Sequence, residues 1–318
     1  MRLCRIRPIG SEPIACFYYD DFAVPIPNVQ RINHLAAYGA LPLLPNPSPD
    51  LLDYLPPNWA NYQILRQLEL LAGLDEADED LRISVDEVWM DIPVPMPRKL
   101  LCLAGNYEEH VREGGGKPAD KESTFPFFFM KPPTTTVRPT GSAVALPAFS
   151  PEHIDWEVEL TVVIGTYAKD ISPDDADEVI AGYTIGLDMS NRQLRLNPNR
   201  IEQSRTAFHE WLCGKWHDGF APIGPCIVPN DETFDPTEVD ISLAVNGQVM
   251  QQSNTSNMVF DVYEIVSYAS KIMTLEPGDM IMTGTPSGVG AARGIYLRSG
   301  DHISATIEGI GTLEVEIA

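Results

Sequence analysis

Three acidic side chains, Asp155, Glu157 and Glu159, alternate with apolar ones in the segment Asp155-Trp-Glu157-Val-Glu159-Leu, which runs on into Thr-Val-Val-Ile. Residues two apart in a β-strand share a face, so Glu157 and Glu159 point the same way. Two carboxylates about 7 Å apart on one face repel each other unless a positive charge lies between them. A solvent-facing edge strand is the plain alternative, but the apolar continuation favours a strand that enters a core.

A third acidic residue, Asp188, follows the apolar stretch 182–187 and precedes small polar residues. The end of a strand is a common position for a metal ligand. Three carboxylates without a nearby cysteine or histidine favour a hard cation, Mg²⁺ or Mn²⁺, over zinc. The three acids therefore predict a divalent-metal site.

A histidine and a glutamate stand three residues apart in the segment 106–113, and three glycines follow at 114–116. His110 and Glu113 would meet on one face of a helix. A carboxylate beside an imidazole fixes its tautomer and raises its basicity, as a general base requires. The glycine run is typical of the hinge of a mobile lid. A surface histidine is the plain alternative for His110 alone.

The loop Thr283-Gly-Thr285-Pro-Ser-Gly-Val-Gly290 follows an apolar strand candidate. It lacks the Gly-Lys-Ser/Thr ending of a phosphate-binding P-loop, and no suitable helix pattern follows, so nucleotide binding is rejected. Its backbone N–H groups and the Thr285 hydroxyl could hold a carboxylate.

The composition limits the partners of the chain. Its 45 acidic and 22 basic residues leave a net charge of −23 over 318 residues, which repels nucleic acid and anionic membranes. An anionic substrate would need a locally positive pocket, and a bound divalent cation would supply it. The five scattered cysteines contain no C-x-x-C pair, so we expect free thiols. No apolar run approaches the roughly 20 residues of a membrane span, and Pro8 and Gly10 replace a signal core, so we expect a cytoplasmic protein.

The chain divides into two regions that differ in composition and in the pattern of apolar residues, and they must position the candidate site residues. Residues 1–95 are rich in proline (Pro42, Pro45 and Pro47 among them), with a helix expected near 60–73 before the acidic stretch Asp75 to Asp80; we interpret them as a small N-terminal accessory domain. Residues 96–318 form the expected catalytic domain. Its strand candidates are 100–104, 127–130, 160–164, 241–245, 280–283 and 303–307, its helix candidates 173–181 and 260–273, and Asn246-Gly247 predicts a hairpin turn. This layout predicts an α+β fold around a mixed sheet.

Seven motifs in order resemble the fumarylacetoacetate hydrolase family over about residues 100–318. They are Asn106-Tyr-x-x-His-x-x-Glu113, Lys131-Pro132, the Asp155 to Leu160 run, Asp188 with Arg192, Gly214-Lys215 to Gly224-Pro225 with Asn246-Gly247, Asn254-Thr-Ser-Asn-Met-x-Phe260, and Gly284-Thr-Pro-x-Gly-Val-Gly290. The resemblance implies a mixed β-sheet roll that is usually a homodimer.

The resemblance also implies a role for each matched residue. Glu157, Glu159 and Asp188 would bind the metal, His110 and Glu113 would form a lid-borne dyad that activates water, Lys215 would hydrogen-bond to substrate or metal-bound oxygen, and Thr285, Lys131 and Arg192 would bind substrate. In this chain, Arg195 replaces the glutamine that the family often carries, and it could touch a second anionic group on the substrate. The stretch 196–214 also looks long for the family, with a helix expected at 200–212.

We therefore expect an enzyme that acts on a small 2-oxo acid. Hydrolytic C–C cleavage of an acylpyruvate-type 2,4-dioxo acid comes first because the His–Glu dyad is complete. The alternatives use the same site for oxaloacetate decarboxylation, dehydration of a 2-oxo-3-deoxy sugar acid, or isomerisation. An acidic metal-binding scaffold without catalysis is disfavoured by His110, Lys215 and Thr285.

Overall fold

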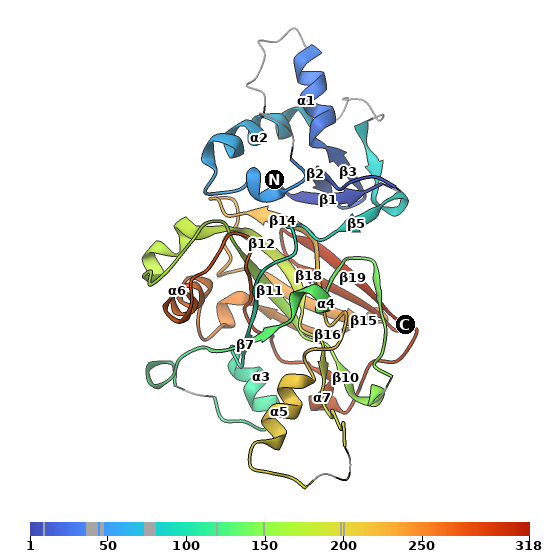
Figure 1. Cartoon of the computed structure of the whole chain (residues 1–318), viewed down its shortest axis with the longest axis vertical. Helices are drawn as coiled ribbons and strands as arrows, with labels where there is room; N and C mark the ends of the chain where they lie inside the picture. The colour runs from blue at the N-terminus through green and yellow to red at the C-terminus, as the bar shows by residue number, and fades with distance from the viewer. Residues whose placement is uncertain are drawn as a thin grey trace.

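A twelve-stranded mixed sheet runs through the protein in the computed structural model (Figure 1), which describes residues 1–318 except 9, 36–43, 45–47, 73–80, 119, 149, 198 and 200. The prolines 42, 45 and 47 and the acidic stretch Asp75 to Asp80 lie outside the described residues. The sheet has the order β4-β3-β2-β1-β14-β12-β11-β17-β6-β7, with β5 beside β1 and β8 beside β14. The expected α+β fold with a mixed sheet is confirmed.

The N-terminal residues supply one end of this sheet. Figure 1 shows two helices, α1 and α2, lying over these strands. The single register pair Leu3↔Ile227 joins β1 to β14 of the following region. The elements are β1 (Leu3–Arg7), β2 (Ile14–Tyr19), β3 (Phe22–Pro25), α1 (Ile26–Leu35), α2 (Trp59–Ala72), β4 (Ile83–Ser84) and β5 (Trp89–Asp91).

The remaining strands and helices build the roll around the site. Its first half consists of β6 (Leu100–Ala104), α3 (Glu108–Glu113), β7 (Phe127–Lys131), α4 (Pro133–Thr136), β8 (Val137–Pro139), β9 (Ser142–Val144), β10 (Ile154–Asp155), β11 (Val158–Ile164), β12 (Ile180–Leu187) and β13 (Ser190–Asn191). Its second half consists of α5 (Thr206–Cys213), β14 (Ala221–Pro229), β15 (Asp240–Val245), β16 (Gln248–Asn254), α6 (Val262–Ile272), β17 (Met280–Met282), α7 (Gly290–Arg293), β18 (His302–Ile307) and β19 (Gly311–Ile317).

A second sheet packs against the first to form the core. Its order is β16-β15-β18-β19-β9, and its β15–β16 hairpin turns at Asn246-Gly247 with φ values of +50° and +76°, as the sequence predicts. Strands β11 and β12 are buried along their whole length because they lie in the middle of the large sheet. Buried strands of this kind favour the continuous Val, Leu and Ile runs seen in both.

Two helix predictions differ from the structure. Residues 173–179 form two 3₁₀ turns, Pro173–Asp175 and Asp177–Val179, instead of a helix to 181, because Ile180 is already paired with Ile164 in the sheet. The helix expected from 200 is shorter and spans α5, 206–213. The predicted helix near 260–273 is confirmed as α6, which begins at an Asp261–Glu264 capping box. Within the described part of the chain, no helix is long and apolar enough to span a bilayer.

Candidate metal centre and active site

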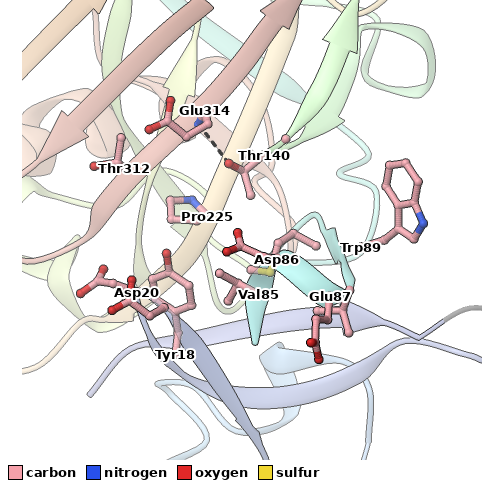
Figure 2. Close-up of a pocket in the computed structure, with 14 residues that line it drawn as sticks. Tyr18, Asp20, Val85, Asp86, Glu87, Trp89, Thr140, Pro225, Thr312 and Glu314 are labelled. Atoms are coloured by element: carbon pink, nitrogen blue, oxygen red, sulfur yellow. Dashed lines mark hydrogen bonds between the residues drawn. The ribbon is translucent and has the colours of Figure 1, made fainter. Parts of the chain in front are cut away.

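A large acidic hollow lies between the N-terminal strands and the roll (Figure 2). Its volume is about 750 Å³, and its lining includes Tyr18, Trp89 and Pro225. Five carboxylic acids line it and, among the described lining residues, there is no lysine or arginine. An anionic 2-oxo acid would be repelled there. None of the residues predicted for the site lies in this hollow.

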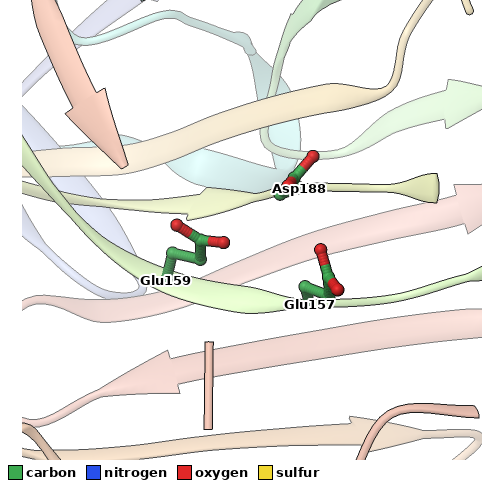
Figure 3. A group of neighbouring side chains, drawn as sticks. All are labelled: Glu157, Glu159 and Asp188. Atoms are coloured by element: carbon green, nitrogen blue, oxygen red, sulfur yellow. The ribbon is translucent and has the colours of Figure 1, made fainter. Parts of the chain in front are cut away.

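The three predicted metal ligands meet in the centre of the large sheet (Figure 3). Glu157 directly precedes β11, Glu159 is its second residue, and Asp188 directly follows β12. The antiparallel pairing Val158↔Leu187 brings the start of β11 beside the end of β12, and the Asp188 N–H donates to the Glu157 carbonyl at 2.9 Å. One oxygen of each carboxylate lies within 4.8 Å of the others, and all three residues are at most 3% exposed.

Two cationic side chains, Lys215 and Arg192, lie against two of these carboxylates. The Lys215 ammonium lies 2.5 Å from both Glu157 Oε2 and Asp188 Oδ2, and the Arg192 guanidinium donates to Glu157 Oε1 at 2.5 Å. Burial alone would raise the pKa of Glu157, but the charges of Arg192 and Lys215 outweigh it and lower that pKa. Glu157 is therefore an ionised carboxylate.

Glu159 has no cationic partner among the described residues. Its Oε2 accepts one hydrogen bond, from the Gly284 N–H at 2.6 Å. Burial and the charges of Asp188 and Glu157 raise its pKa well above the usual range. A bound cation would therefore favour the ionised form of Glu159, which burial and the two neighbouring carboxylates disfavour.

Asp188 is paired with a second buried lysine. Its Oδ1 lies 2.6 Å from the Lys131 ammonium, which also donates to the carbonyls of Met189 and Phe220 at 2.8 and 2.5 Å. Three carboxylates therefore converge, and Glu159 among them has no cationic partner within the described residues. Such a buried oxygen-donor set fits a hard divalent cation of the Mg²⁺ or Mn²⁺ type.

The predicted His–Glu dyad lies on α3 and faces the acidic group. His110 Nδ1 lies 2.9 Å from Glu113 Oε1, and His110 Nε2 lies 3.9 Å from Glu157 Oε1. With Nδ1–H donating to the carboxylate, Nε2 is left as a proton acceptor. Burial would raise the pKa of Glu113, but its hydrogen bonds with His110 and the Gly288 N–H lower it. Glu113 is therefore ionised and able to orient the imidazole.

A hollow of about 490 Å³ gives access to the dyad. Its lining consists of Gly105, His110, Val111, Glu113, Gly114, Gly116, Arg192, Val289, Ala291 and Ala292. Glu113 Oε2 accepts the Gly288 N–H at 2.8 Å, so the α3 segment is docked onto the glycine-rich loop. This contact holds the dyad beside the metal centre.

The four residues predicted to bind substrate differ from one another in burial and in the groups that they contact. Lys131 is wholly buried behind Asp188, and Arg192 is engaged with Asp155 and Glu157. The Thr285 hydroxyl donates to the Val158 carbonyl at 2.9 Å and accepts from the Gln251 amide at 2.8 Å. Arg195 is exposed, and its backbone N–H donates to Ser150 Oγ at 3.3 Å. The structure therefore brings Lys131, Arg192 and Thr285 to the metal centre, but not Arg195.

Sequence reasoning missed three buried polar residues that support the site. Asn106 donates to the carbonyls of Phe260 and Thr283 at 2.9 and 2.8 Å and so fixes the start of the α3 segment. Gln251 accepts from the Val158 N–H at 3.1 Å and donates to Thr285. Asp155 binds Arg192. Asn106 and Asp155 stand within the quoted motifs, whereas Gln251 gives no signal in the sequence.

Comparison with known proteins assigns this fold and acidic centre to one protein family. The family model described as Fumarylacetoacetate (FAA) hydrolase C-terminal matches residues 99–318, and the chain belongs to this family. One relative is the mitochondrial oxaloacetate tautomerase FAHD2A of Bos taurus. This chain is 41% identical to it over 229 residues, which cover 71% of this chain and 68% of the relative.

Solved structures that resemble the whole chain include enzymes of two reaction classes. One is 5-carboxymethyl-2-hydroxymuconate delta-isomerase from Mycobacterium smegmatis, with a TM-score of 0.68, 29% identity, and coverage of 100% of this chain and 98% of that one. The other is maleylpyruvate hydrolase from Sphingobium sp. SYK-6 in complex with manganese (II) and pyruvate, with a TM-score of 0.71, 26% identity, and coverage of 100% and 99%. The family thus includes both isomerases and hydrolases.

The docking of α3 leads to a prediction about its mobility. We expect residues 106–116 to exchange amide hydrogens faster without ligand than with Mn²⁺ and oxalate, because Glu113 holds α3 against the loop through hydrogen bonds such as that from the Gly288 N–H. Hydrogen–deuterium exchange followed by mass spectrometry measures the difference, with α6 as the internal control. Equal protection of 106–116 in both states would contradict a lid.

Proposed function

We propose that this protein is a divalent-metal-dependent isomerase that moves a proton between carbon 3 and the 2-oxygen of a small 2-oxo dicarboxylic acid of the oxaloacetate type. The observation that carries the proposal is the position of His110 Nε2, 3.9 Å from a carboxylate of the metal centre. A proton acceptor beside the atoms that bind a 2-oxo acid is what keto–enol exchange requires. The 41% identity to an oxaloacetate tautomerase supports this substrate class.

The side chains of this protein supply the proton transfers. Glu157, Glu159 and Asp188 would hold the cation, which when bound supplies positive charge against the negative charge that develops on the 2-oxygen. His110 Nε2 takes the proton from carbon 3, and the ionised Glu113 stabilises the resulting imidazolium through Nδ1–H. The same Nε2–H then returns the proton to the oxygen, so the reaction has no net proton change. Glu113 and Gly288 keep the α3 segment docked during the transfer.

Hydrolytic C–C cleavage of an acylpyruvate, the first expectation from the sequence, is the second candidate. The likeness to maleylpyruvate hydrolase over the whole chain favours it, and His110 would then take a proton from water instead of carbon. It comes second because the identity is 26% over the whole chain for this hydrolase, against 41% over 71% of the chain for the tautomerase. Decarboxylation needs no base of this kind, so it leaves His110 unexplained.

A substrate panel separates these activities. With Mg²⁺ or Mn²⁺, we expect the enol form of oxaloacetate to lose its ultraviolet absorbance faster with the protein than without it, with no release of CO₂. Glu159→Gln, which alters the metal site without removing the dyad, serves as the matched blank. Cleavage of acylpyruvates to pyruvate without enol conversion would establish the hydrolase instead, and CO₂ release from oxaloacetate would establish the decarboxylase.

The homodimer that the resemblance implies is part of the proposal. Both the family fold and two exposed aromatic residues at edge strand β7, Phe125 just before it and Phe127 within it, support a partner chain. Sedimentation equilibrium of the purified protein distinguishes a dimer from a monomer.

A further inference from the structure

A fourth carboxylate, Asp155, lies beside the metal centre and takes no part in the proposed proton transfer. It is wholly buried. Its Oδ1 accepts from the backbone N–H groups of Trp156 and Gly290 at 2.9 and 2.6 Å. Its Oδ2 accepts from Arg192 Nε at 2.8 Å and from the Ala291 N–H at 3.1 Å. A buried charge with this many partners joins several segments at one point.

The first of these segments leads to a metal ligand. Arg192 donates through Nε to Asp155 and through a terminal nitrogen to Glu157 Oε1 at 2.5 Å. The guanidinium group is planar and rigid, so the carboxylate that binds one edge sets the direction of the other donors. Asp155 therefore determines where Glu157 Oε1 lies, and Glu157 Oε2 remains beside Lys215.

The second segment leads to the lid. Gly290 and Ala291 begin α7, and two residues before them Gly288 donates to Glu113 of the dyad. A side chain at Gly290 would place its Cβ 2.7 Å from Asp155 Oδ1 and 2.1 Å from the Ile295 carbonyl, so the close approach of loop and carboxylate requires glycine there. Asp155 thus also fixes the loop onto which α3 docks.

We infer that Asp155 is a positioning residue that couples the two halves of the site: it fixes Arg192 against Glu157 and the 288–291 loop against the lid. Two buried carboxylates share one guanidinium here, an arrangement that apolar packing of similar volume could replace at little cost in stability. A role in holding the metal ligand and the lid together accounts for it. This inference rests on the proposed metal site.

The test compares two identical substitutions at wholly buried aspartates. Asp155→Asn keeps the volume but leaves only one acceptor oxygen, so it loses either the pair Trp156 and Gly290 or the pair Arg192 and Ala291, as well as the negative charge. Asp279→Asn is the matched control, because Asp279 also accepts two backbone N–H groups, at 3.0 and 2.7 Å, and pairs with Lys99 at 2.7 Å, but it takes no part in the site. Both variants should unfold at a lower temperature than the wild type.

The readouts are the Kd for Mn²⁺ by titration calorimetry, without substrate, and hydrogen exchange of residues 106–116. We expect Asp155→Asn to weaken Mn²⁺ binding by about 10- to 100-fold, as for other groups that orient metal ligands, and to speed exchange in the lid. Asp279→Asn should change neither. An equal loss of affinity in both variants would reduce Asp155 to a general stabilising role and overturn the inference.

A second variant approaches the same contact from its other partner. Arg192→Lys keeps a positive charge but cannot bridge both carboxylates, so it should weaken Mn²⁺ binding at least about tenfold. If Asp155 acts through Arg192, the losses in the double variant will not add. Losses of Mn²⁺ affinity that add in the double variant would overturn the inference. If Asp155→Asn does not fold, an unchanged Kd in Arg192→Lys would overturn it. Failure of the wild type to bind Mn²⁺ would instead overturn the metal site itself.

Discussion

Glu159→Gln should lower turnover by more than about a hundredfold and leave the metal-free protein at least as stable as the wild type. The glutamine keeps the volume of Glu159 and can still accept the Gly284 N–H, but it removes a metal ligand. Stability should not fall, because Glu159 has no cationic partner among the described residues and burial already raises its pKa. Thermal unfolding with EDTA and steady-state kinetics with Mg²⁺ measure the two effects.

Substitution of Asp188 should also cost stability, which distinguishes it from substitution of Glu159. Asp188→Ala would leave Lys131 and Lys215 buried without this carboxylate, so it should destabilise the protein by about 3–5 kcal/mol as well as inactivate it. Glu314→Gln, on β19 away from the centre, is the control and should retain activity. Full activity of the wild type after exhaustive chelation, or of Glu159→Gln, would rule out the metal centre.

His110→Ala should reduce turnover by about 10²- to 10⁴-fold, the usual contribution of a general base. Its Nε2 is the proton acceptor that lies 3.9 Å from Glu157. His110 is not one of the three residues that would hold the cation, which are Glu157, Glu159 and Asp188. Mn²⁺ affinity should therefore change little, and the loss should fall on kcat more than on KM.

Two further variants assign this loss to the dyad. Glu113→Gln should have a milder effect, because the imidazole remains but loses its ionised partner. His302→Ala removes an exposed histidine paired with Glu314 and should leave turnover unchanged. Turnover of His110→Ala within a few-fold of the wild type would mean that another group transfers the proton, and would favour decarboxylation.

Much of the site follows from local patterns. The alternation at 157–160 predicts a strand with both glutamates on one face, and the i,i+3 spacing of His110 and Glu113 predicts their contact on a helix; β11 and α3 agree with both. Each of these patterns depends on the geometry of one element, which neighbouring residues determine. The helix expected at 173–181 failed for the opposite reason, because the pairing of Ile180 with Ile164 in the sheet outweighs the local preference.

The amino-acid sequence by itself determined the family, the mixed-sheet fold and the three acids of the metal centre, because each rests on residue types at fixed spacings. Only the tertiary structure decided which charges those acids meet. The packing of distant segments brings Lys131 and Lys215 to Asp188 from 57 and 27 positions away along the chain, and leaves Glu159 without a cation among the described residues. It also engages the Thr285 hydroxyl with Val158, 127 positions away, and exposes Arg195. Such distant pairings depend on the register of whole strands, so no local spacing could reveal them.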